Sequence, residues 1–251
     1  MADMALAVQQ ILIISFSVGC TSSVSGEASI KIVNGTEAFP GQFPFMAVVQ
    51  DKENDRHCGG ALIHPNWIVT DSFILTHPEN TQVVLGLHDY SNFSNGGRPE
   101  IFGIAEIVKV PVNETNYLAL VKLDRPVAPG NPYIQTIALA PQDDYDYIGA
   151  NCYFSGWGEP LPIVPGVLQY LFANIVSEEE CFVPNIEREL CAKDGHTGTC
   201  VGESGGPLSC RRDGQTYLVG TLQLSSWCGI LQTSYFHRMT YYSDWIRTVI
   251  G

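Results

Sequence analysis

Two short stretches of the chain carry side chains that could do chemistry. In CVGESGGPLSC (Cys200–Cys210), Ser204 stands between an acid and two glycines, while CGGALIHPNWIVTD (Cys58–Asp71) leads directly into Ser72 and Phe73. A serine hydroxyl becomes a nucleophile when a base takes its proton, a buried acid orients that base, and two backbone N–H groups hold the oxyanion. Because GESGGP taken alone also fits a turn of an unrelated protein, the rest of the chain has to decide what Ser204 does.

The elements that would position these stretches are short strands joined by turns. The 251 residues include 24 glycines and 15 prolines, and long helical periodicity is absent before the C-terminus, which favours an all-β chain. A stretch rich in Pro, Gly and Asp, 126–149, separates two sets of expected strands. The first set is FMAVVQ, CGGALIHPNWIVT, TQVVLGLHDY, AEIVKVPV and YLALVKL, and the second is CYFSGWG, LQYLFANIVS, GPLSCRR, QTYLVGTLQL and TSYFHRMT. The closing YYSDWIRTVIG predicts a short amphipathic helix with Ser243 as a possible cap.

Charge and the N-terminal segment narrow the class of partner. Acidic side chains outnumber basic ones 26 to 13, giving a formal net charge of -13, and such a chain repels a phosphate backbone. The apolar segment 4–19 is too short for a comfortable membrane span and precedes small polar residues, which indicates a secretory signal over residues 1–23. We therefore expect an extracellular protein with neither a nucleic acid nor a membrane as partner.

The cysteines predict a disulfide framework. Most of them follow residue 150 and none forms a CxxC pair, so disulfides are favoured over a zinc site. Disulfides in turn fit an oxidising, extracellular compartment. The eight cysteines are Cys20, Cys58, Cys152, Cys181, Cys191, Cys200, Cys210 and Cys228.

From Ile32 to Gly251 the sequence resembles a trypsin/chymotrypsin-type (S1) serine protease. Six motifs carry the resemblance in order: IVNG after Lys31, CGGALIHPNWIVT, LALVKLDRPV, CYFSGWG, CVGESGGPLSC and DWI. The resemblance implies an all-β fold of two antiparallel six-stranded β-barrels with the site in the cleft between them and a C-terminal helix. After the signal peptide expected over 1–23, it implies a short pro-segment over 24–31 and a trypsin-like domain over 32–251.

Carried over residue by residue, the resemblance implies a degenerate catalytic triad. Ser204 matches the nucleophile, and Gly202 and Ser204 match the oxyanion-hole donors. The base is expected where TDSFI places Phe73, and the orienting acid where NYLALVKL places Tyr117. A benzyl group takes no proton, and a phenol with a pKa of about 10 is neutral at physiological pH.

The substrate pocket implied by the resemblance also departs from the family pattern. Gly198 stands where an aspartate or small residue lines the pocket, so no charge is present to hold a basic side chain. Large side chains are expected to fill the pocket. The remaining positions expected to line it are Gln223, Leu224, Ser225, Trp227 and Tyr235.

The activation switch of the family is partly matched. Lys31 and Ile32 stand where cleavage would free a new amino terminus, and Glu203 replaces the aspartate that would bury it. Because glutamate is one methylene longer and a buried ion pair depends on its geometry, both cleavage after Lys31 and an uncleaved pro-segment remain open.

The resemblance also implies how the cysteines pair. The expected disulfides are Cys152–Cys210, Cys181–Cys191 and Cys200–Cys228. The usual partner position of Cys58 is occupied by Ile74, so Cys58 is expected to be unpaired, as a buried thiol, with pairing to Cys20 or to another chain as the alternatives.

Glycosylation is predicted at two sequons, Asn92 in a polar turn and Asn113, with Asn34 the least favoured of the three. The calcium loop of the family has no convincing match in LHDYSNFSNGG, and we expect no metal and no cofactor.

The function expected from these residues is that of a secreted, monomeric serine protease homologue without proteolytic activity, acting by binding a protein partner whose identity the sequence leaves open. It would be a decoy or regulator of a protease cascade or of a host or tissue protein. One alternative is an active endopeptidase of unusual specificity, in which His77 and Glu114 replace the missing base and acid. Another is a storage or structural protein.

Overall fold

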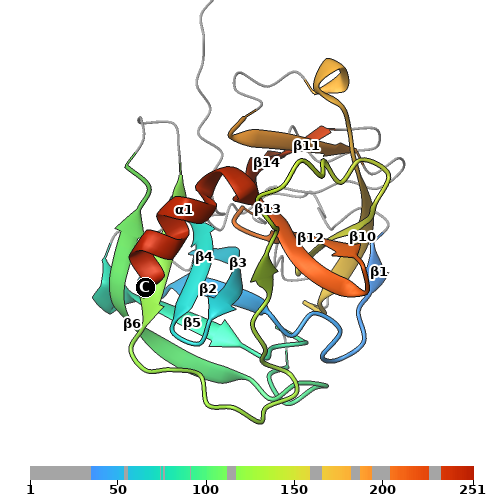
Figure 1. Ribbon diagram of the computed structural model, residues 1–251. Helices are drawn as coiled ribbons and strands as arrows, with labels where there is room; N and C mark the ends of the chain where they lie inside the picture. The colour runs from blue at the N-terminus through green and yellow to red at the C-terminus, as the bar shows by residue number, and fades with distance from the viewer. Residues whose placement is uncertain are drawn as a thin grey trace, which may run out of the picture.

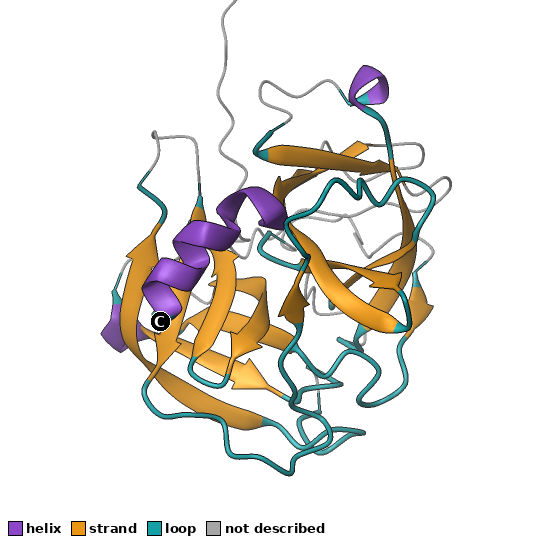
Figure 2. Ribbon diagram, viewed as in Figure 1, coloured by secondary structure: helices purple, strands orange, loops and turns teal. Residues whose placement is uncertain are grey.

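The computed structural model describes residues 35–53, 56–73, 75, 77–90, 92–111, 117–158, 166–181, 187–193, 204–225 and 233–251. Within these ranges strands dominate, and the C-terminal helix α1 is the only helix longer than a single turn (Figure 2). Two bodies of strands lie side by side, with α1 packed against them (Figure 1). The predicted all-β fold of two six-stranded antiparallel barrels with a C-terminal helix is confirmed.

The first barrel is closed and follows the order β2-β3-β4-β7-β6-β5. Its strands are β2 (Met46–Asp51), β3 (Arg56–His64), β4 (Trp67–Asp71), β5 (Thr81–Leu85), β6 (Glu100–Lys109) and β7 (Leu118–Leu123), with the short helix η1 (Pro78–Asn80) before β5. Alternate residues of each strand point inward, so that Val49, Ile68, Leu85 and Val121 share one apolar interior. Strand β5 ends earlier than its sequence run predicts, because Gly86 takes a φ of 70° and leaves the extended conformation.

The second barrel closes through the pairing of β10 with β9. Its strands are β9 (Asn151–Gly156), β10 (Gln169–Ile175), β11 (Glu189–Lys193), β12 (Pro207–Arg212), β13 (Gln215–Ser225) and β14 (Thr233–Arg238), with the short helix η2 (Glu178–Glu180) between β10 and β11. Two short strands attach to this barrel. β1 (Thr36–Glu37) pairs with β10, and β8 (Ala138–Leu139), which lies in the connection between the barrels, pairs in parallel with β13.

A third apolar cluster joins the barrels to helix α1 (Met239–Ile250). Val69 of β4, Leu118 of β7 and Leu218 of β13 share it with Tyr242 and Ile246 of the helix. This interbarrel layer fixes how β4 sits relative to β13, and therefore where the ends of these strands present their side chains.

Ser243 does not cap the helix, contrary to the sequence-based expectation. The helix begins at Met239, directly after β14, and Ser243 lies on its buried face. The amphipathic pattern was correct, but the strand before it runs into the helix without a polar cap. None of the described helices is long and apolar enough to cross a membrane.

Candidate functional site

The turn that carries Ser204 is held between the two barrels by backbone hydrogen bonds. Gly59 N on β3 donates to Ser204 O at 3.0 Å, while Gly205 N donates to Leu222 O on β13 at 2.7 Å. One bond reaches the first barrel and the other reaches the second. The turn therefore lies at the junction of the barrels, where the resemblance expects the site.

Glycines are required on both sides of this contact. Gly205 has a φ of 80°, and a Cβ added to it would lie 2.4 Å from Gly59 O and 2.7 Å from Asp71 N. A Cβ on Gly59 would lie 2.7 Å from Gly206 Cα. Since real Cβ atoms do not approach backbone atoms this closely, the glycines of CGG and SGG pack backbone against backbone.

The side chain of Ser204 is nearly buried, with 6% of the residue exposed. None of the residues that the structure describes forms a hydrogen bond with Ser204 Oγ. Its predicted oxyanion partner Gly202, as well as Gly198 and Glu203, lies outside the described residues.

An aromatic pair occupies the positions at which the resemblance expects the base and the orienting acid. The rings of Phe73 and Tyr117 meet edge to face, with 6.1 Å between their centroids and 76° between their planes. Phe73 is half-buried and packs on the interior of the first barrel. The backbone joins the two segments as well, because Ser72 N donates to Tyr117 O. The structure thus brings Phe73 and Tyr117 together, as the sequence predicts.

A buried acid that the sequence analysis did not single out lies two residues before Phe73. Asp71 is 2% exposed, and its Oδ1 accepts a hydrogen bond from Phe73 N at 2.7 Å. Burial raises the pKa of Asp71 to about 7, and the bond from Phe73 N and the charge of Lys109 limit the rise. The available signal was an acid at the end of the otherwise apolar strand WIVTD.

His77, the residue considered as a replacement base, points elsewhere. It lies at the start of η1, where its side chain is 64% exposed, and its Nδ1 lies 3.8 Å from Glu79 Oε1. It makes no hydrogen bond to Ser204. Glu114, the matching acid, lies outside the described residues, as do Lys31 and Ile32 of the activation segment.

Strands β13 and β14 place four of the predicted pocket residues. Gln223 sits at a register shift of β13, while Leu224 pairs with Tyr235 and Ser225 with Ser234 on β14. Tyr235 is half-buried between β11 and β13. Trp227 lies outside the described residues.

The predicted disulfides are confirmed where the structure describes them. Cys152 of β9 is bonded to Cys210 of β12, directly opposite in register, and Cys181 is bonded to Cys191. Cys200 and Cys228 lie outside the described residues.

The expectation that Cys58 is unpaired is wrong. Cys58 is disulfide-bonded, and none of the described cysteines is free. Its partner lies outside the described residues, because the other four described cysteines pair with one another. The prediction set Cys20 aside with the signal segment and so counted an odd number of cysteines, whereas the whole chain has eight.

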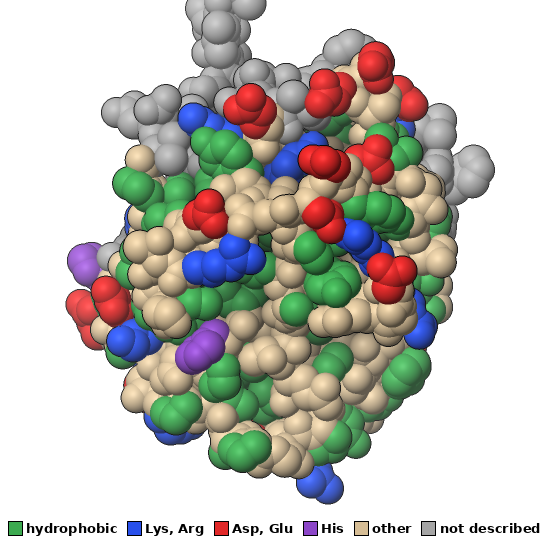
Figure 3. Space-filling view, in the orientation of Figure 1, with side chains coloured by type: hydrophobic (Ala, Val, Ile, Leu, Met, Phe, Trp, Pro, Cys, Tyr) green, Lys and Arg blue, Asp and Glu red, His purple; other side chains and the backbone are tan. Residues whose placement is uncertain are grey.

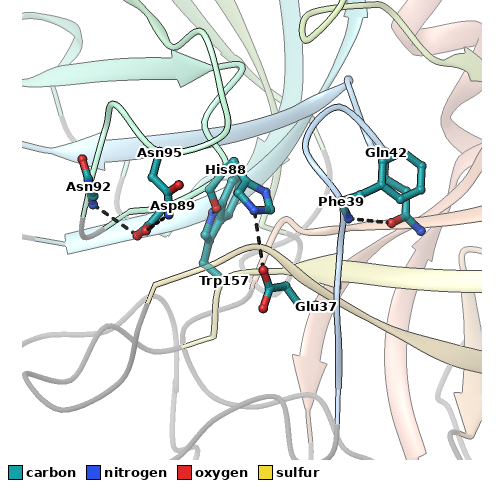
Figure 4. Close-up of polar contacts among 8 residues, drawn as sticks. All are labelled: Glu37, Phe39, Gln42, His88, Asp89, Asn92, Asn95 and Trp157. Carbon is teal, nitrogen blue, oxygen red and sulfur yellow. Dashed lines mark hydrogen bonds and ion pairs between the residues drawn. The ribbon is translucent and has the colours of Figure 1, made fainter.

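The loop after β5 is organised by amides around an acid (Figure 4). Asp89 Oδ1 accepts from Asn92 N at 3.1 Å, and Asp89 Oδ2 accepts from Asn95 Nδ2 at 2.8 Å. The loop is tied to the second barrel by Trp157 Nε1, which donates to His88 O at 3.1 Å. In the part of the chain that the structure describes, no group of three His, Cys, Asp or Glu side chains is placed to hold a metal ion. Asn92 is exposed at the turn, whereas Asn113 lies outside the described residues.

Comparison with known proteins identifies the family. The sequence matches the trypsin family over residues 32–246. It is 28% identical over 240 residues to a dog protein called hepatocyte growth factor activator serine proteases, covering 86% of this chain and 36% of that protein. The human hepatocyte growth factor activator serine protease is 27% identical over 240 residues, which again cover 86% of this chain and 36% of that protein. The chain therefore spans only about a third of the length of these curated relatives.

A solved structure shows the same fold. The human heparin binding protein superposes with a TM-score of 0.74 at 28% identity, over 87% of this chain and 96% of that chain. Together with the two barrels, the Ser204 turn at their junction and the family match over most of the chain, this establishes that the protein belongs to the trypsin-like (S1) serine protease family.

Proposed function

We propose that this chain is a secreted serine protease homologue without proteolytic activity, which binds a protein partner as a decoy or regulator of a protease cascade or of a host or tissue protein. The observation that carries the proposal is the edge-to-face packing of Phe73 and Tyr117 at the positions of base and acid. Neither ring can take the proton of Ser204 or stabilise an imidazolium. In a serine protease, loss of the base alone lowers turnover on the order of a million-fold.

The pocket strands support the same proposal. Where the family pattern reads Ser-Trp-Gly, β13 carries Gln223, Leu224 and Ser225, and Tyr235 stands opposite Leu224. Gln223 is larger than the serine of the family pattern, and with the half-buried ring of Tyr235 it reduces the room for a substrate side chain. A binding role needs a stable surface and tolerates such changes.

The charge of the chain argues for a protein partner over a polyanion. Acidic side chains gather on the upper part of the face seen in Figure 3, where Figure 1 places η2 with its three consecutive glutamates. The formal net charge is -13. Heparin is a polyanion, and it would be repelled by this chain. Heparin binding, which the name of the solved relative states, is therefore not expected of this protein.

Secretion forms part of the proposal. The disulfides Cys152–Cys210 and Cys181–Cys191 fit an oxidising compartment. The sequon at Asn92 is exposed at a turn whose backbone is held by Asp89. A glycan at Asn92 would be accommodated there without disturbing a strand.

The test of the proposal is a search for turnover. Protein cleaved after Lys31 is incubated with diverse peptide libraries, in parallel with the Ser204→Ala variant as a matched control. We expect the two proteins to give the same background. Cleavage by the native protein that disappears in Ser204→Ala would establish the alternative, an endopeptidase of unusual specificity.

The binding role is tested by co-purification from the native fluid. A partner present in stoichiometric amount supports a decoy or regulator. Recovery of the chain without a stoichiometric partner would favour a storage or structural role instead.

A further inference from the structure

The interbarrel layer behind Ser204 contains polar groups that the proposed function does not use. On β13 and β14, Thr221 and His237 lie directly opposite each other in register. Their neighbours Leu222 and Phe236 point into the second barrel, so strand alternation turns Thr221 and His237 outward, toward the layer shared with the first barrel. The ring of His237 contacts Tyr242 of α1 in this layer, at 5.8 Å between centroids.

Both side chains are buried, and each has a polar atom without a hydrogen-bond partner. Thr221 is 0% exposed and His237 is 2% exposed. Thr221 Oγ1 and His237 Nε2 find no hydrogen-bond partner among the described residues. A buried polar group left unpaired is costly, and most such groups in folded proteins are satisfied by protein or ordered water.

The first barrel contributes an acid to the same layer. Asp71 follows Val69 by two residues on β4 and stands opposite Leu118 of β7. Val69 and Leu118 both belong to the interbarrel layer. Asp71 therefore faces the layer. Its Oδ1 is occupied by Phe73 N, whereas its second oxygen takes no hydrogen bond from the described residues.

The two strands that carry these groups meet at the Ser204 turn. β4 packs against β13, and Gly205 lies between them, bonded to Leu222 O and close to Asp71 N. Cross-strand partners such as Thr221 and His237 have Cβ atoms about 5 Å apart, which leaves their polar ends within reach of one small molecule.

We propose that Thr221, His237 and Asp71 hold an ordered water between the two barrels, directly behind the Ser204 turn. Water fits because it donates two hydrogen bonds and accepts two, and a buried water needs about two to four polar partners. Asp71 accepts, the threonine hydroxyl donates or accepts, and a neutral imidazole nitrogen does either. The water would link a strand of the first barrel to two strands of the second.

The protonation of His237 supports this arrangement. Burial lowers the pKa of His237 to about 4, so the imidazole is neutral at physiological pH. A neutral ring can share one water with the carboxyl of Asp71 without placing a second charge in the layer.

The direct test is a crystal structure of the native protein at a resolution that shows ordered water. We expect a density peak within about 3.2 Å of both Thr221 Oγ1 and His237 Nε2. A layer with no density between these atoms overturns the proposal. This readout requires no variant and so does not depend on whether a substitution folds.

A second test uses the sign of a stability change. Thr221→Val keeps the shape of the side chain and removes the hydroxyl, so loss of the water contact should lower the melting temperature by roughly 2–4 °C. If the layer is dry, the valine relieves an unpaired hydroxyl, and an unchanged or higher melting temperature overturns the proposal. Thr70→Val is the matched control, because Thr70 is equally buried and its Oγ1 already donates to Gly59 O at 2.6 Å.

Discussion

The Ser204 turn and the Phe73–Tyr117 pair adjoin at the end of β4, but they depart from the family pattern to different degrees. The turn keeps the pattern because its backbone demands it. Gly205 has a positive φ and has backbone atoms of Gly59 and Asp71 where a side chain would begin. The pair meets through its side chains, with two aromatic rings edge to face at the positions where the resemblance expects a base and an acid.

The difference teaches that a preserved motif can report folding instead of chemistry. The glycines of CGG and SGG are needed to bring the barrels into contact, whatever Ser204 does. Base and acid have no such structural duty, so packing can replace them. The GESGGP sequence is therefore a strong sign of the family and a weak sign of catalysis.

The largest expected effect comes from breaking the turn. Gly205→Ala should destabilise the protein by more than about 4 kcal/mol or prevent folding, because the new Cβ meets backbone atoms of β3 and β4. Gly214→Ala is the matched control. Its φ of 81° is nearly the same, but no atom lies within 4 Å of the added Cβ, so only the conformational cost of about 1–2 kcal/mol is expected. Urea unfolding measures both, and equal losses would show that the close contact does not matter.

The second-largest effect is expected from Asp71, the acid between the Ser204 turn and the Phe73–Tyr117 pair. The folded pKa of Asp71, about 7, lies above its unfolded value of 3.8. Its contribution to stability is therefore present below pH 3.8 and is lost as the pH rises through about 7. Relative to Asp71→Asn, the native protein should lose about 2–3 kcal/mol of unfolding free energy between pH 5 and pH 8.

The comparison with Asp71→Asn also removes the opposing titration of His237. The folded pKa of His237, about 4, lies below its unfolded value of 6.5, so its contribution is present above pH 6.5 and is lost as the pH falls through about 4. That titration occurs in both proteins and cancels in their difference. Parallel pH profiles of the two proteins would contradict the raised pKa of Asp71.

The packing of the aromatic pair predicts a moderate effect. Phe73→Ala removes a half-buried ring from the surface of the first barrel's core and should cost about 2 kcal/mol of unfolding free energy. Phe73→Leu keeps most of the apolar contact and should cost less than half as much. If both variants match the native protein in urea unfolding, the ring of Phe73 has no packing role, and packing does not explain the aromatic pair.

The smallest effect is expected from the phenol. Tyr117→Phe keeps the ring that meets Phe73 edge to face at 6.1 Å, so stability should change by less than about 0.5 kcal/mol. Tyr117→Ala serves as its counterpart and should lose the ring contact. A large loss in Tyr117→Phe would assign a role to the hydroxyl that packing alone does not give.

Prediction from the sequence succeeded where local pattern and motif agree. Alternating apolar runs indicated the strands, and the order of the motifs indicated two barrels and the partners Cys152–Cys210 and Cys181–Cys191. The approach of Phe73 to Tyr117 followed from the same motif positions.

The features that were not predicted depend on contacts between segments far apart in the chain. Asp71 looks like an ordinary strand end until Leu118 and the interbarrel layer bury it. Ser243 has the composition of a cap, but the packing of α1 places it on the buried face. Cys58 was expected to be unpaired because Ile74 occupies its usual partner position, whereas its disulfide reaches a cysteine elsewhere in the chain.

The most direct test of the central claim is labelling of Ser204 by a fluorophosphonate, which reacts with an activated serine hydroxyl. The protein is cleaved after Lys31, and labelling is followed by intact mass alongside Ser204→Ala and an active trypsin-like enzyme. The account predicts that the native protein remains unlabelled, like Ser204→Ala, under conditions where the active enzyme is fully modified. Robust labelling of the native protein that is lost in Ser204→Ala would contradict it, because Ser204 would then have a base that the Phe73–Tyr117 pair does not provide.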